Sequence, residues 1–452
     1  MRTGEQLTDF LSYYEGHLDV YRADKRRLSG VLERSNVKYG AWTLMCEMMP
    51  LILARDERAA IARAAEHVLA AAERFTQFIL DHSGYHRHFH WPPAFWDVVR
   101  LDPGYSLNVP CARCDSFLDG AKLTFIELNT DGCSGMSNAD AFHEGYASVV
   151  QPRAELGLAG CTHDAVVPHV IDTLLACYRE FRDNNRAHTL PAEPVIGILD
   201  WKGEETRWEF DAIASACRAR GLAAHVVSPD EAAFDGTGLS FDGTRIHLIY
   251  RRLLGADYAA GMDKLDAVTA AYRARAVCMV GSPRSQIAFS KKFFAFLHDP
   301  VFLESLPDET RAVVRQTVPW TRVLEETKAD FHGETADLVP FVLAHRERFV
   351  LKPAVSKCGI GIMLGRSTPE AEWNCAVLDA VAKDFIIQEL VPSVEANFSR
   401  FTKRQPMERR FIHLGEYVFG GRFSGFLGRT CAHELLNIRH GERLLPVLTA
   451  GQ

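Results

Sequence analysis

The stretch FIELNTDGCSG, residues 125 to 135, begins as an apolar strand and then places Glu127, Asn129 and Asp131 at alternate positions. Side chains alternate between the two faces of a strand, so all three are expected on one side. Just upstream, RCD puts Arg113 and Asp115 on one face of a neighbouring strand. Carboxylate and amide oxygens suit magnesium, which takes one or two carboxylates together with water and substrate phosphates. Arg113 could hold a phosphoryl group or a substrate carboxylate. An ion-paired hairpin is the alternative interpretation.

A second candidate is the segment FVLKPAVSKCGIGIMLGR, in which Lys352 lies at the end of a predicted strand. After it, Ser356, Lys357, Gly359 and Gly361 form a turn of small and flexible residues. Backbone N–H groups in such a turn can approach phosphate oxygens. A plain hairpin between two strands is the alternative, and the spacing of a Walker P-loop does not occur.

Two further segments carry groups suited to a nucleotide. The strand DFIIQELVP ends in Gln388, Glu389 and Val391, where alternating backbone N–H and C=O groups can meet an adenine edge. Glu389 could reach the adenine amine or a ribose hydroxyl, although an ordinary strand end has the same pattern. Upstream, SQIAFSKKFF contains the paired lysines Lys291 and Lys292.

Composition limits the classes of partner. The chain has 452 residues, 47% hydrophobic and 24% charged, and single cores rarely exceed roughly 250–300 residues, so we expect several lobes. A net charge of -7 offers no basic footprint for nucleic acid or anionic membranes, and neither is an expected partner. No early segment has the apolar length of a signal peptide or a membrane span, which predicts a cytoplasmic protein.

Cysteine and histidine positions raise a metal alternative that we do not favour. The eleven cysteines are scattered, and only Cys111 and Cys114 form a CxxC, so reduced and buried thiols are expected. His86, His88 and His90 alternate and would share one face if extended. A histidine-rich polar surface is commoner than a metal site for such a pattern.

The elements that must position these groups follow from hydrophobic periodicity. Residues 1–100 have apolar residues at helical spacing, and residues 101–150 contain two strands joined by a turn at Asp119 and Gly120. Residues 194–285 alternate strand, helix and strand, but GILDW is not followed by GxGxxG, which argues against a dinucleotide site. Short strands and helices continue to the C-terminus. The sequence therefore predicts a mixed α/β protein.

Taken together, RCD, IELN, the paired lysines, VLKPA, GIG and QELV resemble a circularly permuted ATP-grasp ligase, like the synthetase domain of glutathionylspermidine synthase. In ordinary ATP-grasp enzymes the lysine, the glycine loop and the hinge precede the acidic strands, whereas here the acidic strands come first. The resemblance extends from Leu107 onward. It implies a permuted ATP-grasp fold with four parts: a helical region (1–100), metal-binding strands (101–150), a preATP-grasp-like α/β domain (151–285) and an ATP-binding lobe (286–452).

The resemblance also implies roles for individual residues. Arg113 matches the arginine over the transferring phosphate. The other matches fall into two groups: the magnesium ligands Asp115, Glu127 and Asn129, and the ATP-binding residues Lys291, Lys292, Lys352, Ser356, Lys357, Gly359, Gly361, Gln388, Glu389 and Val391. The turn after Lys352 has fewer glycines than the family's phosphate loop.

ATP and magnesium are thus the implied cofactors, and an amide-forming ligase that makes an acyl phosphate and releases ADP is the implied activity. Its implied partners are a small-molecule carboxylate and an amine. The arginines Arg251, Arg252 and Arg284 are candidates for gripping a substrate carboxylate, with a structural ion pair as the alternative for each. A nucleotide-binding regulatory protein and an ATP-dependent phosphotransferase remain the other hypotheses. The sequence does not indicate an oligomeric state.

Overall fold

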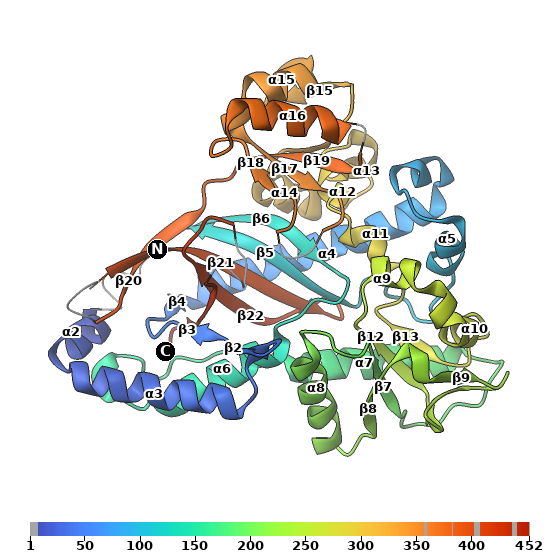
Figure 1. The fold of residues 1–452 in the computed structure, drawn as a ribbon, viewed down its shortest axis with the longest axis horizontal. Helices are drawn as coiled ribbons and strands as arrows, with labels where there is room; N and C mark the ends of the chain where they lie inside the picture. Colours follow the sequence, from blue (N-terminus) through green and yellow to red (C-terminus); the bar gives the residue numbers. More distant parts are fainter. Residues whose placement is uncertain (1–7, 357–358, 382, 402–406, 436–440, 452) are drawn as a thin grey trace.

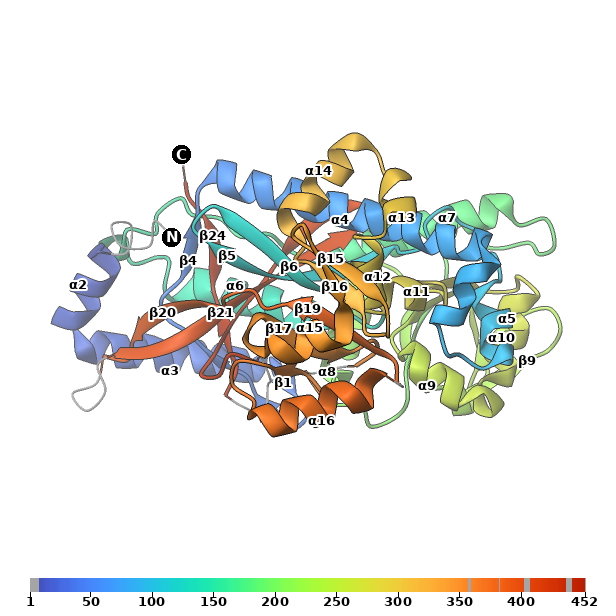
Figure 2. The same cartoon turned by 90° about the horizontal axis from the view of Figure 1, so that it is seen from above.

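The computed structural model describes residues 8–356, 359–381, 383–401, 407–435 and 441–451. At its centre lies a seven-stranded sheet with strand order β3-β23-β22-β21-β5-β6, in which β20 also pairs with β21. Figure 1 shows this sheet below one lobe and beside another. The helix α4 (Arg55–Asp81) packs along the sheet, against β21 and β22, and is visible there in both Figure 1 and Figure 2. The bounds of the strands are β3 (Met45–Cys46), β5 (Cys111–Asp119), β6 (Lys122–Asn129), β20 (Val394–Ser399), β21 (Met407–Phe419), β22 (Arg422–Cys431) and β23 (Arg443–Leu445).

The predicted hairpin between β5 and β6 is confirmed. The two strands are antiparallel, and Asp119 pairs with Lys122 across the turn. Gly120 takes a φ of 58°, a left-handed conformation that a glycine adopts without steric cost. The turn therefore fixes the register that aligns the polar residues at the other end of the hairpin.

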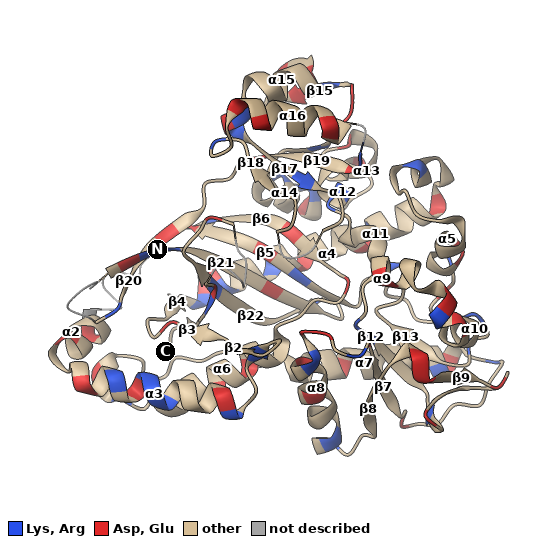
Figure 3. Cartoon of the chain, viewed as in Figure 1, with Lys and Arg blue, Asp and Glu red and all other residues tan. Residues whose placement is uncertain are grey.

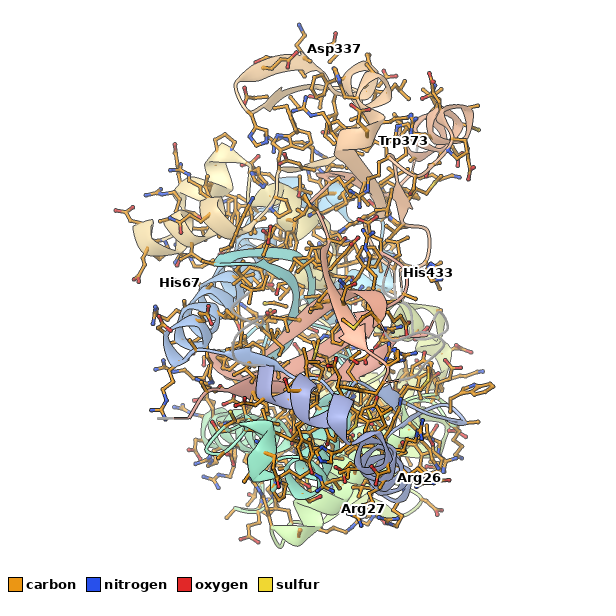
Figure 4. All side chains as sticks on the ribbon, turned by 90° about the vertical axis from the view of Figure 1, so that its left-hand side faces the viewer. Arg26, Arg27, His67, Asp337, Trp373 and His433 are labelled. Atoms are coloured by element: carbon orange, nitrogen blue, oxygen red, sulfur yellow. The ribbon has the colours of Figure 1, made fainter. Side chains whose placement is uncertain are left out.

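The upper lobe in Figure 1 has its own sheet, of strand order β14-β19-β17-β18. Its core is a separate hydrophobic cluster that includes the fully buried Trp373, which Figure 4 labels inside the lobe, with Asp337 toward its outer end. The bounds are β14 (Thr321–Val323), β15 (Lys328–Phe331), β16 (Glu334–Asp337), α15 (Leu338–Ala344), β17 (Phe349–Pro353), β18 (Met363–Leu364), α16 (Glu370–Val381) and β19 (Phe385–Glu389).

The predicted strand–helix–strand unit is also confirmed. Its four strands are parallel, in the order β13-β12-β7-β8. The bounds are α7 (Val167–Asn184), β7 (Ile196–Leu199), α8 (Arg207–Ala219), β8 (Ala224–Val227), β12 (Leu248–Arg251), α9 (Gly255–Ala260), α10 (Asp266–Arg273) and β13 (Cys278–Val280). A small antiparallel sheet of β9 (Ala232–Phe234), β10 (Leu239–Phe241) and β11 (Thr244–Ile246) follows β8.

The N-terminal region is less uniformly helical than its sequence predicts. It contains α2 (Thr8–Gly16), α3 (Leu18–Arg34), α4 and α5 (Pro93–Val99), together with the short strands β1 (Lys38–Tyr39), β2 (Trp42–Thr43), β3 and β4 (Leu51–Leu53). The strands β3 and β4 pair in parallel with β23 and β24 (Val447–Thr449) at the other end of the chain. Strands of two or three residues are too short to show a hydrophobic periodicity, and their partners lie at the other end of the chain. The sequence pattern therefore does not predict them.

Five helices join these parts: α6 (Met136–Val149), α11 (Ser285–Phe289), α12 (Lys292–Phe296), α13 (Pro300–Glu304) and α14 (Asp308–Thr317). The helix α6 follows the hairpin, and the other four link the parallel unit to the upper lobe. Figure 3 shows acidic and basic residues spread over the helices, with both signs also on the central strands. Within the described ranges, no helix combines the length and the apolar character needed to cross a membrane.

Candidate functional site

A cavity of about 530 Å³ lies between the central sheet and the upper lobe. Its walls come from β5, β6, β21 and β22 of the sheet, from β17, β19 and the turn after β17, and from loops of the parallel unit. The structure thus brings together segments that are far apart in the sequence. The predicted residues that line the cavity are Arg113, Asp115, Glu127, Asn129, Arg252, Lys352, Gly359, Gln388, Glu389 and Val391.

Strand register explains why the polar side chains meet. Across β21, β5 and β6, Gly415, Asp115 and Glu127 lie directly opposite one another. One step along, Arg113 lies opposite Asn129. Since alternate residues of a strand share a face, these side chains converge on the cavity side of the sheet.

A bulge in β6 adjusts this alignment. The register passes from Asp115 opposite Glu127 to Ser116 opposite Phe125, so that Ile126 is the extra residue. A bulge changes the direction of nearby side chains, and here both Ile126 and Glu127 line the cavity. The sequence pattern does not reveal this feature.

The expected set of three alternating residues is wrong at its last member. The strand β6 ends at Asn129, and Asp131 lies in the following loop. The Asp131 carboxylate forms a fully buried ion pair with Arg251 and accepts a bond from the Gly255 N–H. Asp131 therefore anchors the loop to the parallel unit.

Asp115 is held between two arginines. Arg113 donates from Nε to Oδ1 at 2.7 Å and from Nη2 to Oδ2 at 3.0 Å, and Asn129 donates to Oδ2 at 3.3 Å. Nη2 of Arg429, on β22, lies 3.1 Å from Oδ1. Burial raises the pKa of the Asp115 carboxyl, but Arg113 and Arg429 outweigh it and hold that pKa below its ordinary value.

Gly415 makes room for this group. A Cβ at that position would lie 2.9 Å from Cδ of Arg113 and 3.2 Å from Oδ1 of Asp115. Only a residue without a side chain lets the bidentate pair lie flat against β21.

Arg429 and His413 are site residues that sequence reasoning missed. They are cross-strand partners on β22 and β21, both line the cavity, and both are buried. Burial, assisted by Arg429, lowers the pKa of His413 to about 3, so the imidazole is neutral at pH 7. Among the described residues, Nε2 of His413 and Nε of Arg429 lack a hydrogen-bond partner, whereas Nη2 of Arg429 faces Asp115. Alternation along the strand containing Leu427 and Arg429 is the signal that could have found them.

Two lysines of the predicted ATP-binding lobe contact the strand β6, which carries Glu127. Lys352, at the end of β17, donates to the Ile126 carbonyl at 3.1 Å although the two residues are 226 positions apart. It also donates to Oε1 of Gln388 at 2.7 Å. Burial lowers the pKa of Lys352 to about 8, with Glu127 acting in the opposite direction.

Lys291 is the second lysine at the site. Its Nζ lies 2.9 Å from Oε1 of Glu127 and donates to the carbonyl and the hydroxyl of Ser356 at 3.3 and 3.2 Å. The ammonium group therefore connects the predicted magnesium strand to the predicted phosphate turn.

Lys292 does not reach the cavity, which corrects its predicted role. Its side chain is 2% exposed, and Nζ forms an ion pair with Asp384 and a hydrogen bond to the His88 carbonyl. Consecutive residues on a helix point about 100° apart, and α12 begins here, so only one of the paired lysines can face the site.

The three alternating histidines do not share a face, contrary to the extended geometry considered for them. His86 and His88 lie in a 3-10 turn, Ser83–His88. His86 bonds to the Ile79 carbonyl at 2.8 Å, and His90 lies 3.7 Å from Asp384. Their contacts are separate: His86 bonds within the N-terminal region, whereas His90 reaches Asp384.

The turn after β17 keeps its glycines for steric reasons. Gly359 and Gly361 have φ values of 69° and 77°, and a Cβ at Gly361 would lie 2.7 Å from Cγ of Pro353. Gly359 lines the cavity, whereas Ser356 contributes through its bonds to Lys291. Lys357 lies outside the described residues.

The end of β19 forms another wall. Gln388 is buried, and its amide bridges Lys352 and Oγ1 of Thr321, to which Nε2 donates at 3.0 Å. Glu389 donates its N–H to the Trp320 carbonyl at 2.8 Å, and its carboxylate lies 3.1 Å from Nε2 of His332. Gln388 therefore positions a lysine, while Glu389 and Val391 line the open side.

The three arginines considered for substrate binding have different surroundings. Arg251 is fully buried against Asp131, and Arg284 bonds to the Leu101 carbonyl and to Asn108; neither lines the cavity. The expectation that these two grip a substrate is therefore not supported. Arg252 does line the cavity, where it pairs with Glu209 at 2.8 Å.

The donor set can be tested for its fit to magnesium. Two carboxylates and one amide oxygen face the cavity, and both carboxylates are neutralised by side-chain cations, Asp115 by arginines and Glu127 by Lys291. Within the described part of the chain, no three His, Cys, Asp or Glu side chains cluster as a complete metal cage. Magnesium commonly uses only one or two carboxylates plus phosphate oxygens, so the residues fit a metal that arrives with a nucleotide.

Comparisons with known proteins bear on the fold. No protein-family model and no curated protein sequence matches this chain. Among solved structures, a glutathione synthetase like-effector from Globodera pallida is similar over 95% of this chain and 96% of its own, with a TM-score of 0.60 and 10% identity. A putative gamma-glutamylcysteine synthetase from Methylobacillus flagellatus covers 84% of this chain and 86% of its own at 15% identity, but its TM-score of 0.41 supports no further argument. The first similarity agrees with the predicted mixed α/β class, and at this identity it shows a shared fold alone.

Proposed function

We propose that the protein is an ATP-dependent carboxylate–amine ligase that forms an amide through an acyl phosphate. The observation that carries the proposal is the meeting of two lysines with the acidic hairpin. Lys291 contacts Glu127, and Lys352 contacts the β6 backbone; Glu127 and Lys352 line the cavity together with Arg113 and Asp115. A nucleoside triphosphate binds with Mg²⁺. Ammonium groups can hold its phosphates, and carboxylate and amide oxygens beside them can hold the metal.

In this proposal the nucleotide lies between the sheet and the upper lobe. Lys291 and Lys352 bind phosphate oxygens, and the turn at Gly359 brings backbone N–H groups close to them. Glu389 and Val391 contact the adenosine, while Gln388 acts through Lys352, whose ammonium it holds at 2.7 Å. Lys357 keeps its predicted role near the phosphates as a proposal from the sequence alone.

The acyl substrate would bind where the arginines converge. Arg113 and Arg429 flank Asp115, and Nε of Arg429 has no hydrogen-bond partner among the described residues. A carboxylate there can attack the γ-phosphate, and the same guanidinium groups stabilise the developing charge. Neutral His413 can donate or accept a hydrogen bond beside them without adding charge.

Asp115, Glu127 and Asn129 would hold the magnesium ion. When bound, the ion supplies positive charge against the phosphate oxygens. The residues themselves must exchange partners for this to happen, because Arg113, Arg429 and Lys291 now occupy the carboxylates. Released from Asp115, the two arginines become available to an anionic substrate.

The order of elements supports a permuted version of the fold, because the acidic strands β5 and β6 precede β17 and β19 in the chain. We propose small-molecule carboxylate and amine substrates, such as amino acids or short peptides. The cytoplasmic location and the domain boundaries expected from the sequence stay predictions.

Hydroxylamine trapping tests the proposal. Purified protein is incubated with ATP, Mg²⁺, hydroxylamine and pooled carboxylic acids, and hydroxamate is measured. We expect hydroxamate to form only with certain acids. Tight Mg-ATP binding with no hydroxamate in any pool would favour a nucleotide-binding protein, and a stable phosphorylated product would favour a phosphotransferase.

A further inference from the structure

The cavity extends from Arg113 to a second, acidic end formed by the parallel unit. Asp200 follows β7, Glu204 lies in the loop before α8, and Asp257 lies on α9, and all three line the cavity. The three carboxylates therefore face the same cavity. Asp200 is buried, whereas Glu204 and Asp257 are half-buried, and a buried carboxylate is normally paired.

Of the three carboxylates, Asp200 is the one that is buried without a cationic partner among the described residues. It is 8% exposed, and within the described ranges its carboxylate accepts a hydrogen bond only from the backbone N–H of Trp201, at 2.8 Å. Among the described residues, no cationic side chain forms an ion pair with it. Burial, together with Glu204 and Asp257 and against the effect of Arg252, raises the pKa of Asp200 to about 7.

The two cations at this end are already engaged. Arg252 forms an ion pair with Glu209 and donates to the carbonyl groups of Cys133 and Gly132. Its Nε is buried and has no partner within the described ranges. Lys38 places its ammonium over the Trp208 ring, 4.8 Å from the centroid. In the part of the chain that the structure describes, no cationic side chain forms an ion pair with Asp200, Glu204 or Asp257.

One short loop joins this end to the reacting centre. Arg113 donates to the Ser134 carbonyl at 2.7 Å, and Arg252 donates to the carbonyl of the adjacent Cys133 at 2.6 Å. Both arginines thus hold the same loop from opposite sides. A ligand at Asp200 shares one continuous cavity with a group held at Arg113.

We propose that this end binds the amine substrate as a protonated primary amine, and that Asp200 takes its proton as the catalytic base. The inference rests on the proposed ligase function. Asp200, Glu204 and Asp257 supply the negative charge that an ammonium group requires. The free Nε of Arg252 can serve an oxygen of the same substrate, such as an amino-acid carboxylate.

The substrate nitrogen bonds to the acyl carbon, and the bond from that carbon to the phosphate oxygen breaks with its electron pair leaving on phosphate. An ammonium group loses two protons in becoming an amide N–H. One passes to the Asp200 carboxylate and then to water, and the other leaves with phosphate as HPO₄²⁻. General-base assistance of this kind contributes about 10²–10⁴ in rate.

Direct binding is the first test, since it needs no acyl substrate. Protein with AMPPNP and Mg²⁺ is titrated calorimetrically with 1,4-diaminobutane, lysine and succinate. We expect at least one amine to bind, and Asp200→Asn to weaken it at least tenfold. Asp211→Asn, on the exposed face of α8, is the matched control and should not change the affinity. Equal binding to Asp200→Asn, or binding of succinate alone, would overturn the inference.

Trapping separates this inference from the ligase proposal. Hydroxylamine reacts as a neutral nucleophile, so hydroxamate reports acyl phosphate formation without the ammonium substrate, and thermal unfolding shows whether Asp200→Asn is folded. Amide formation with the ammonium substrate should fall by about 10²–10⁴. Hydroxamate in both proteins with equal amide rates would refute the role of Asp200. No hydroxamate in the wild type would instead refute the ligase, and the titration would still decide whether amines bind at Asp200.

Discussion

The substitution Glu127→Gln removes one negative charge from the cavity and leaves the side chain almost the same size. Oε1 of Glu127 lies 2.9 Å from Nζ of Lys291, whose other partners belong to Ser356. The glutamine oxygen can still accept a bond from Lys291. The Glu127 side chain is 25% exposed, so solvent screens the pair, and we expect a loss of only about 1–3 kcal/mol in unfolding free energy.

The loss of function should be much larger than the loss of stability. Removing one preorganised electrostatic contact typically costs about 10²–10³ in rate, roughly 3–4 kcal/mol. The assay is acid-dependent hydroxamate formation, with thermal unfolding and AMPPNP binding with and without Mg²⁺ measured in parallel. Wild type should bind AMPPNP more tightly with Mg²⁺, and the variant should lose that gain.

Glu372→Gln, at an exposed position of α16, is the matched control and should behave as wild type. A folded Glu127→Gln protein that keeps its Mg²⁺ response, and a rate within about tenfold of wild type, would refute the role of this carboxylate.

Further outcomes are expected at Lys352, Gly415 and Lys292. Lys352 has a folded pKa of about 8, below its ordinary value, so AMPPNP affinity should fall by up to about tenfold per pH unit above pH 8, and a flat profile to pH 9.5 in calorimetry would contradict this. The same shift favours the neutral amine in the folded state, so its contribution to stability should rise as pH increases from 8 toward 10. Gly415→Ala forces a Cβ to 2.9 Å from Cδ of Arg113 and should cost about 1–3 kcal/mol in chemical denaturation, with an unchanged midpoint as the contrary result. Lys292→Ala breaks the pair with Asp384 and should lower the melting temperature without weakening AMPPNP binding; a selective loss of binding would restore Lys292 to the site.

The hairpin and the parallel unit could be predicted because their signals are local. Asp119 and Gly120 encode a tight turn between two alternating strands, and the strand, helix and strand after residue 194 show clear periodicity. Lys352 was identified because a proline follows it at the end of an apolar strand. These features need only neighbouring residues to be understood.

The remaining features depend on contacts between distant segments. Nothing local distinguishes Lys291 from Lys292, because the helix that separates their directions begins between them. Arg429 belongs to the site only because β22 pairs with β21, which places it opposite His413. Asp200 resembles an ordinary residue after a strand until the parallel unit is folded against the hairpin.

The most direct test of the central claim is ADP release by purified protein with ATP and Mg²⁺, measured with a carboxylic acid and an amine added separately and together. We expect rapid release of ADP and phosphate only when both substrates are present, and almost none from Glu127→Gln. AMP and pyrophosphate as products, or an ADP rate that no acid or amine changes, would contradict it.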